Sequence, residues 1–158
     1  MILKPKHFYK KIEDIQIENL KKFDLIFLDL DNTLVNPETI EFKTSVLDWL
    51  NKIKNKDNFI ILSNSKSILK RKKEIEEKTN LKIFLNKHKK PSSSLYRELD
   101  QKFNLKNKKI AIIGDNIFTD ILFGNLNNFE TFLVETKYPD NWFKTIVNNL
   151  FMKILRIK

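Results

Sequence analysis

The stretch Leu25–Leu34, with the sequence LIFLDLDNTL, decides the fold that we expect for this chain. Four apolar residues are followed at once by Asp29 and Asp31, two positions apart. An uncharged run bounded by polar residues is typical of a central strand in a sheet covered on both faces. Alternate strand residues point to the same side, so the two carboxylates would repel unless a cation such as Mg²⁺ lay between them. The alternative is a solvated turn after the strand, where Asp is common.

The composition indicates one globular domain. The 158 residues are enough for a domain with its own core, and 41% of them are hydrophobic. The chain has no cysteine, which excludes disulfides, thiolate metal sites and a cysteine nucleophile. No run reaches membrane-spanning length, and the first residues lack the apolar centre of a signal peptide. We therefore expect a cytoplasmic protein.

Charge and glycine content are both unusual. The net charge of +10 indicates either attraction to nucleic acid or an anionic membrane, or a compositional bias toward Lys, Asn and Ile. The lysines are scattered, and acids follow the longest basic cluster, Lys70–Lys73, so we interpret them mainly as solvated helix faces and predict no specific nucleic-acid partner. The only two glycines, Gly114 and Gly124, are expected where the backbone needs conformational freedom.

Strands and helices are predicted to alternate along the chain. Apolar runs predict strands at about 24–30, 58–63, 83–85, 109–113 and 131–134. Helical periodicity predicts helices at about 38–56, up to 79, after 92, around 121–126, and from 140 onward. This alternation indicates an α/β, Rossmann-like fold with a central parallel sheet of about five strands flanked by helices.

We expect residues 1–158 to form a single domain, with a lead-in (1–22), a catalytic core (23–135) and a C-terminal helical tail (136–158). In the lead-in, a short helix on the sheet and an edge-padding segment are expected. The helix residues are Ile12, Ile15 and Leu20, and the padding residues are Pro5, Phe8 and Tyr9.

Ligands of parallel α/β sheets bind beyond the carboxyl ends of the strands. Asp29, Ser63 and Asp115 follow predicted strands, and Lys90 lies in a loop after another. A phosphoryl-transfer site needs a nucleophile, a divalent cation, a proton carrier and positive groups. Asp29 can attack phosphorus, Asp31 can protonate the leaving oxygen and then activate water, and Asp29 with Asp115 can hold Mg²⁺. Ser63 can bind phosphate, unless it simply caps the next helix, and Lys90 can add positive charge.

Here the sequence resembles the haloacid dehalogenase (HAD) superfamily of phosphatases. Its four motifs match, in order, Asp29-Leu30-Asp31-Asn32-Thr33, Ser63, Lys90-Pro91, and Gly114-Asp115 with Asp120. The resemblance covers about residues 22–134 and implies a Mg²⁺-dependent phosphatase that forms an aspartyl phosphate. Lys89 is an alternative to Lys90, but the neighbouring Pro91 favours Lys90.

The resemblance also implies the role of each site residue. The catalytic residues are Asp29, Asp31 and Lys90. The residues that bind the substrate phosphate are Ser63, Asn64 and Lys90. The metal ligands are Asp29, Asp31 through its main-chain carbonyl, and Asp115. The supporting residues are Thr33, Gly114, Asn116 and Asp120, and we expect Asp120 to orient Lys90 or a metal-bound water.

The spacing of the motifs leaves no room for the cap domain that other members insert after the first or second motif. An open site suits a bulky or surface-bound phosphate. The chain looks most like capless subfamily IIIA, the YqeG-like group related to phosphatidylglycerophosphate phosphatases. It departs from that group at Ser65, at Leu126 and at residues 135–136, where Asn, Arg and Pro are usual. These departures concern the substrate rather than catalysis.

Three functions follow from this interpretation. The first is a phosphatase on a phospholipid head group such as phosphatidylglycerophosphate, peripheral at the inner face of the membrane. The second is a phosphatase on a phosphoprotein, a nucleic-acid end or a soluble metabolite, and the third is a non-catalytic phosphate-binding or regulatory module. The apolar residues near both ends of the chain have two interpretations: they rest on an anionic membrane, or they pack on the sheet. These residues are Ile2, Leu3, Phe8, Tyr9, Phe151, Ile154, Leu155 and Ile157. The sequence does not predict the oligomeric state.

Overall fold

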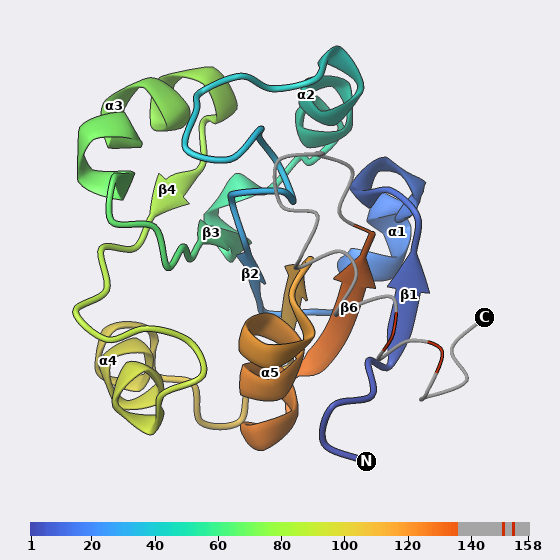
Figure 1. Cartoon of the computed structure of the whole chain (residues 1–158), viewed down its shortest axis with the longest axis vertical. Helices are drawn as coiled ribbons and strands as arrows, with labels where there is room; N and C mark the ends of the chain where they lie inside the picture. The colour runs from blue at the N-terminus through green and yellow to red at the C-terminus, as the bar shows by residue number, and fades with distance from the viewer. Residues whose placement is uncertain (136–149, 151–152, 154–158) are drawn as a thin grey trace.

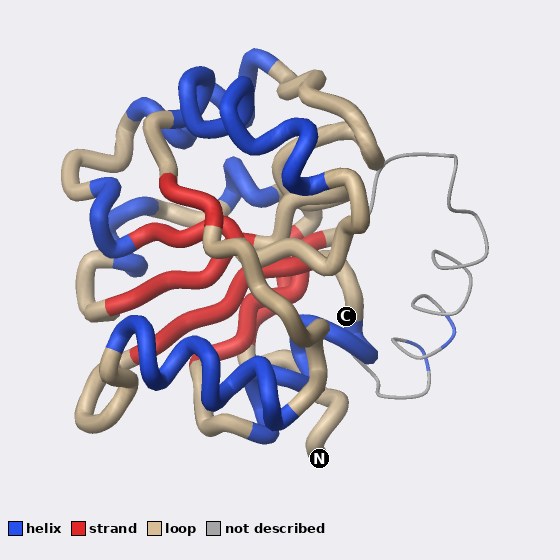
Figure 2. Tube along the Cα trace, turned by 90° about the vertical axis from the view of Figure 1, so that its left-hand side faces the viewer, coloured by secondary structure: helices blue, strands red, loops and turns tan. Residues whose placement is uncertain are grey.

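A computed structural model describes residues 1–135, Leu150 and Lys153, and they show a three-layer α/β fold (Figures 1 and 2). A six-stranded parallel sheet, in the order β1-β6-β5-β2-β3-β4, lies between two layers of helices. The strands are β1 (His7–Tyr9), β2 (Leu25–Leu28), β3 (Phe59–Ile61), β4 (Lys82–Ile83), β5 (Ile110–Gly114) and β6 (Glu130–Val134). The helices are α1 (Ile17–Leu20), α2 (Thr44–Asn51), α3 (Ile68–Thr79), α4 (Ser93–Phe103) and α5 (Leu122–Leu126), with shorter helical turns at Ile12–Asp14, Lys56–Asn58 and Ile117–Ile121. The predicted Rossmann-like fold is confirmed, and the predicted helix from Asp140 lies outside the described residues apart from Leu150 and Lys153.

Strand β2, from the stretch quoted first, forms the centre of the sheet. It pairs with β3 and β5, so Leu28 lies opposite both Ile61 and Ile113. Its side chains alternate between two cores: Ile26 and Leu28 face the core under α1, α2 and α3, while Leu25 and Phe27 face the core under α4 and α5. Because both faces are covered, all four residues must be apolar.

The sheet has six strands rather than about five. The prediction missed β1, which is only three residues long and lies in the lysine-rich lead-in. It pairs with β6, and the His7 ring stacks on Phe132 with centroids 4.4 Å apart. Phe8 and Tyr9, expected to pad the edge, are themselves the edge strand. The lead-in residues Ile12, Ile15 and Leu20 are buried, but they do not share the single short helix that was predicted. Ile12 lies in the turn Ile12–Asp14, Ile15 follows that turn, and Leu20 lies in α1.

The helix predicted from about residue 38 to 56 was wrong at both ends, because α2 spans only Thr44–Asn51. Helix α2 begins only at Thr44, and residues 36–43 form a loop. Glu38 has a φ of 57°, in the left-handed region, and its main-chain N–H donates to Asp31 Oδ1 at 2.8 Å. The Pro-Glu pair that resembled a helix start therefore serves a turn that returns to the Asp31 side chain.

The expectation that the glycines supply backbone freedom was also wrong. Within residues 1–135, no glycine has a positive φ, and asparagines take most of the left-handed positions. Asn80 ends α3 and Asn104 ends α4 in this conformation. Asparagine is the common alternative to glycine at such helix ends. The two glycines instead lie where another side chain approaches the backbone too closely for a Cβ atom.

Candidate active site

The strand register brings the predicted site residues to one edge of the sheet. The N–H of Asp29 donates to Ile113 O at 2.9 Å, and the N–H of Leu62 donates to Leu28 O at 2.8 Å. Asp115 follows β5 directly, and Ser63 follows β3 by two residues. A cleft of about 250 Å³ lies at this edge. It is lined by Asp29, Asp31, Asn32, Pro37, Glu38, Ser63, Asn64, Ser65, Asp115, Asn116, Thr119 and Asp120.

Lys90 reaches into this edge from the loop after β4 and is fully enclosed. Its ammonium group lies 2.7 Å from Asp29 Oδ1, 2.6 Å from Asp120 Oδ1 and 2.8 Å from the main-chain oxygen of Leu62. The Lys90 side chain is 1% exposed, and Asp29, Asp115 and Asp120 are also buried. Lys90 therefore lies inside the aspartate cluster, whereas the alternative, Lys89, is exposed.

The buried charges perturb each other strongly. Burial raises the pKa of Asp29 to about 8; the Lys90 ammonium opposes this rise, while Asp120 and Asp115 add to it. Burial alone would lower the pKa of Lys90, but the attraction of Asp120 and Asp29 outweighs burial and raises it. Three buried acidic groups and one buried ammonium therefore share this edge of the sheet, and a cation would offset the repulsion among the three carboxylates.

The donor set fits a hard divalent cation. Asp29, Asp115 and Asp120 each offer a carboxylate oxygen, and these oxygens lie within 4.8 Å of one another. Oxygen ligands of this kind suit Mg²⁺. Asp29 and Asp120 both pair with Lys90, but the second oxygen of Asp120 also accepts the Asn116 N–H at 3.1 Å, whereas the second oxygen of Asp29 has only the longer contact with Thr33, at 3.4 Å. Asp29 and Asp115 are therefore the carboxylates that we expect to hold the ion. The Asp31 side chain is not part of this group, and ligation by its main-chain carbonyl stays a prediction.

The supporting residues hold the aspartates in place. A Cβ atom at Gly114 would lie 2.3 Å from Asp120 Cγ, so glycine allows Asp120 to pack directly against β5. Asp120 Oδ2 accepts the N–H of Asn116 at 3.1 Å. Asn116 Oδ1 in turn accepts the N–H groups of Phe118 and Thr119 and caps the turn that carries Asp120. On the other side, Thr33 Oγ1 lies 3.4 Å from Asp29 Oδ2.

Ser63 and Asn64, predicted to bind phosphate, have different contacts. Ser63 is buried at the cleft, and its Oγ accepts the N–H of Ser65 at 3.1 Å. Asn64 forms two hydrogen bonds to the Lys90 main chain: Oδ1 accepts its N–H at 2.9 Å, and Nδ2 donates to its carbonyl at 3.0 Å. Asn64 therefore fixes the Lys90 loop against the loop after β3. Phosphate binding by either residue stays a prediction.

Sequence reasoning missed Arg71. We interpreted the cluster Lys70–Lys73 as a solvated helix face, but Arg71 is only 7% exposed. Its guanidinium group pairs with both oxygens of Asp31, at 2.8 and 2.9 Å. A signal was available: Arg71 precedes the buried residues Ile75 and Thr79 at intervals of four, on the face of α3 that packs inward.

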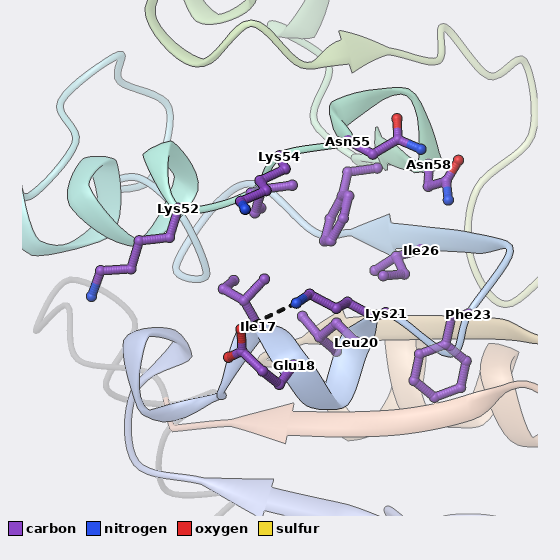
Figure 3. Close-up of a pocket in the computed structure, with 12 residues that line it drawn as sticks. Ile17, Glu18, Leu20, Lys21, Phe23, Ile26, Lys52, Lys54, Asn55 and Asn58 are labelled. Atoms are coloured by element: carbon purple, nitrogen blue, oxygen red, sulfur yellow. Dashed lines mark hydrogen bonds and ion pairs between the residues drawn. The ribbon is translucent and has the colours of Figure 1, made fainter.

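A second cleft, of about 290 Å³, lies on the α1 side of the sheet, where β2 and β3 begin (Figure 3). Its lining combines apolar side chains, such as Phe23, Ile26 and Phe59, with the lysines Lys21, Lys52 and Lys54. Its lining contains a single carboxylate, Glu18, which pairs with Lys21 at 3.3 Å. This lining holds no carboxylate cluster for a cation, unlike the cleft at the carboxyl ends of the strands, which remains our candidate for the active site.

The parallel sheet with a buried Lys–Asp cluster at its carboxyl edge agrees with the HAD-like phosphatase fold that the sequence motifs predicted. The chain belongs to the mitochondrial PGP phosphatase family, whose model matches residues 1–136. It is 31% identical to the probable phosphatase YqeG of Bacillus subtilis over 147 residues, which are 91% of this chain and 84% of that protein. It is 25% identical over 130 residues to a chloroplastic and mitochondrial phosphatidylglycerophosphate phosphatase 1 of Arabidopsis thaliana, covering 77% of this chain but 37% of that protein.

No solved structure gives a significant match to the chain. The family and the two relatives make the chain a phosphatase acting on phosphoric monoesters. Among the described residues, no helix is long and apolar enough to cross a membrane.

Proposed function

We propose that the chain is a Mg²⁺-dependent phosphatase that forms an aspartyl phosphate on Asp29, and that its substrate is a phospholipid head group such as that of phosphatidylglycerophosphate. The observation that supports this mechanism most is the 2.7 Å contact between Lys90 Nζ and Asp29 Oδ1 inside the buried cluster. Lys90 fixes the attacking carboxylate and adds positive charge where the phosphate would approach.

The reaction has two steps. An Asp29 oxygen first attacks phosphorus, and the leaving oxygen departs with a proton from Asp31. Water then attacks phosphorus, gives a proton to Asp31, and releases phosphate and Asp29. Ser63 and the following main-chain amides bind the phosphate oxygens. Bound Mg²⁺, held by Asp29, Asp115 and the Asp31 carbonyl, would neutralise negative charge on the phosphate and nucleophile.

The nucleophile is tested by Asp29→Asn, with Asp48→Asn as the control. Asp48 is an exposed residue of α2 that does not line the cleft. Asp29→Asn should release no phosphate and give no hydroxylamine-sensitive phosphoprotein, whereas Asp48→Asn should behave as the wild type. Substantial turnover by folded Asp29→Asn would contradict the assignment.

The cation has a test that does not depend on turnover. A ligand that binds only the folded state stabilises it by about 2.7 kcal/mol at a hundred times its Kd. Mg²⁺ should therefore raise the melting temperature of the chelator-treated wild type, and Asp115→Asn should remove most of this shift. Equal shifts in both proteins, or full activity in EDTA, would argue against Mg²⁺ at this site.

The lipid substrate is supported by three observations. The segments between Asp31 and Ser63 and between Ser63 and Lys90 contain only elements of the core fold, so neither segment carries an inserted domain that could cover the cleft. The net charge is +10. The matched family model and one relative are named for phosphatidylglycerophosphate phosphatases.

The sequence left open whether the N-terminal apolar residues rest on a membrane or pack on the sheet, and the structure shows both packed and exposed residues among them. Leu3 and Phe8 pack against a core of Ile117, Ile121 and Leu133, whereas Ile2 is 49% exposed. The C-terminal residues of that set lie outside the described residues.

A vesicle experiment tests the substrate. The protein should sediment with anionic vesicles, detach as salt is raised, and hydrolyse phosphatidylglycerophosphate faster than glycerol phosphate. If the protein preferred glycerol phosphate and did not bind vesicles at low salt, the lipid substrate would be wrong and a soluble phosphate ester would be the better proposal.

A further inference from the structure

Helix α3 holds the loop that follows β2. Figure 1 shows this loop running from β2 beside α3 to α2. Arg71 Nη1 donates to the Thr39 carbonyl at 2.7 Å as well as to Asp31 Oδ1, and Lys78 donates to the Ile40 carbonyl at 3.1 Å. One guanidinium group thus connects the loop to the side chain of Asp31.

The hydrogen bonds leave the two oxygens of Asp31 in different states. Oδ1 accepts from Arg71 Nη1 at 2.8 Å and from the Glu38 N–H at 2.8 Å, while Oδ2 accepts only from Arg71 Nη2, at 2.9 Å, among the described residues. A carboxylate oxygen has two lone pairs. Oδ1 is therefore fully occupied, and Oδ2 keeps one acceptor position in a residue that lines the cleft.

A purely structural role explains Arg71 poorly. Burying a guanidinium group is costly even when it is paired, and an apolar residue of similar size often replaces such a pair without loss of stability. Arg71 Nε is also buried without a hydrogen-bond partner among the described residues. The fork of Arg71 does, however, fix the direction of a carboxylate, which an apolar residue cannot do.

We infer that Arg71 is a positioning residue for the second half of the reaction: its fork fixes the direction of the Asp31 carboxyl group, so that Oδ2 faces the cleft and accepts the proton of the attacking water. The water oxygen bonds to phosphorus, the bond from phosphorus to Asp29 breaks, and the proton passes to Asp31 Oδ2. From there it goes to the next leaving group or to solvent. This inference rests on the proposed two-step reaction and adds Arg71 to it.

Burst kinetics with p-nitrophenyl phosphate and Mg²⁺ separate the two steps. Nitrophenolate leaves without a proton, so the first step does not need Asp31, whereas the second step does. Arg71→Met should keep a burst of about one nitrophenolate per enzyme molecule, while steady-state turnover falls about ten-fold or more. Phosphoprotein trapped during turnover should be at least as abundant as in the wild type.

Lys70→Met is the matched control, because Lys70 is the exposed neighbour of Arg71 on α3, and it should leave both phases unchanged. Arg71→Lys keeps the charge without the fork and should fall between wild type and Arg71→Met, which also covers the case that Arg71→Met does not fold. Unchanged steady-state turnover, or a burst lost together with turnover in a folded variant, would overturn the inference. A wild type without turnover would overturn the proposed function, and with it this inference.

Discussion

Replacing each glycine by alanine separates the role of the Asp120–Lys90 pair from that of general packing. A Cβ atom at Gly114 would lie 2.3 Å from Asp120 Cγ and 2.4 Å from its Oδ2. A Cβ atom at Gly124 would meet the methyl groups of Thr131 and Ile112 at 2.4 and 2.5 Å. The two substitutions therefore create contacts of similar severity, one against the site and one against the core.

The expected effects follow from these contacts. Overpacking of this kind costs about 1–3 kcal/mol, so both variants should lose a similar amount of unfolding free energy. In Gly114→Ala, Asp120 must withdraw by about 1 Å to restore an ordinary carbon–carbon separation. Asp120 is tied to Lys90 and to the Asn116 N–H, so Lys90 should shift with it. A misplacement of about 1 Å in an active site costs about a hundred-fold in rate.

Urea unfolding and steady-state kinetics measure the two quantities in the same preparations. Gly114→Ala should lose both stability and about a hundred-fold in kcat, and Gly124→Ala should lose stability alone. If the two variants lost kcat equally, or if Gly114→Ala kept the wild-type kcat, Asp120 would not act through the position of Lys90.

Two further predictions concern stability. In EDTA, burial raises the pKa of Asp29 from an ordinary 3.8 to about 8. The protonated Asp29 therefore contributes to folding stability below pH 3.8, and this contribution is lost as the pH rises to about 8. This loss of stability with rising pH should be missing in Asp29→Asn; parallel pH profiles of the two proteins in urea unfolding would contradict it. Trp49→Phe removes the buried hydrogen bond from Nε1 to the Ile15 carbonyl, 2.7 Å long, and should cost about 1–3 kcal/mol by leaving that oxygen unpaired; an unchanged denaturation midpoint would refute this.

The centre of the sheet was predictable because its residues obey a simple local rule. A strand buried on both faces must be uninterruptedly apolar, and β2, β3 and β5 are. Once these strands are parallel and in register, the residues that follow them must meet at one edge. For this reason Asp29, Ser63 and Asp115 could be placed together without knowledge of any contact. Strand β1 was not predicted, because three half-buried residues are too few to show an alternating pattern. These residues form a strand because they pair with the outer edge of β6.

The helix start near Pro37 failed for a different reason. Proline followed by an acidic residue favours both helix N-termini and turns. Whether a helix or a turn forms depends on which acceptors bind the main-chain N–H groups that follow the proline. Here the N–H of Glu38 binds the Asp31 side chain, so the chain turns back toward the site and the helix begins six residues later. No local pattern encodes that partner.

The positions of the buried positive side chains are a better guide to the candidate site of this chain than its net charge. Thirty lysines and arginines give a large net charge that says little about where a ligand binds. In the described part of the chain, only Lys90 and Arg71 are buried cations. A buried cation without a partner is strongly unfavourable, so each must be explained by the acids around it. Lys90 pairs with Asp29 and Asp120, and Arg71 pairs with Asp31. Both buried cations thus lead to the same edge of the sheet, one to the proposed nucleophile and one to the proposed proton carrier.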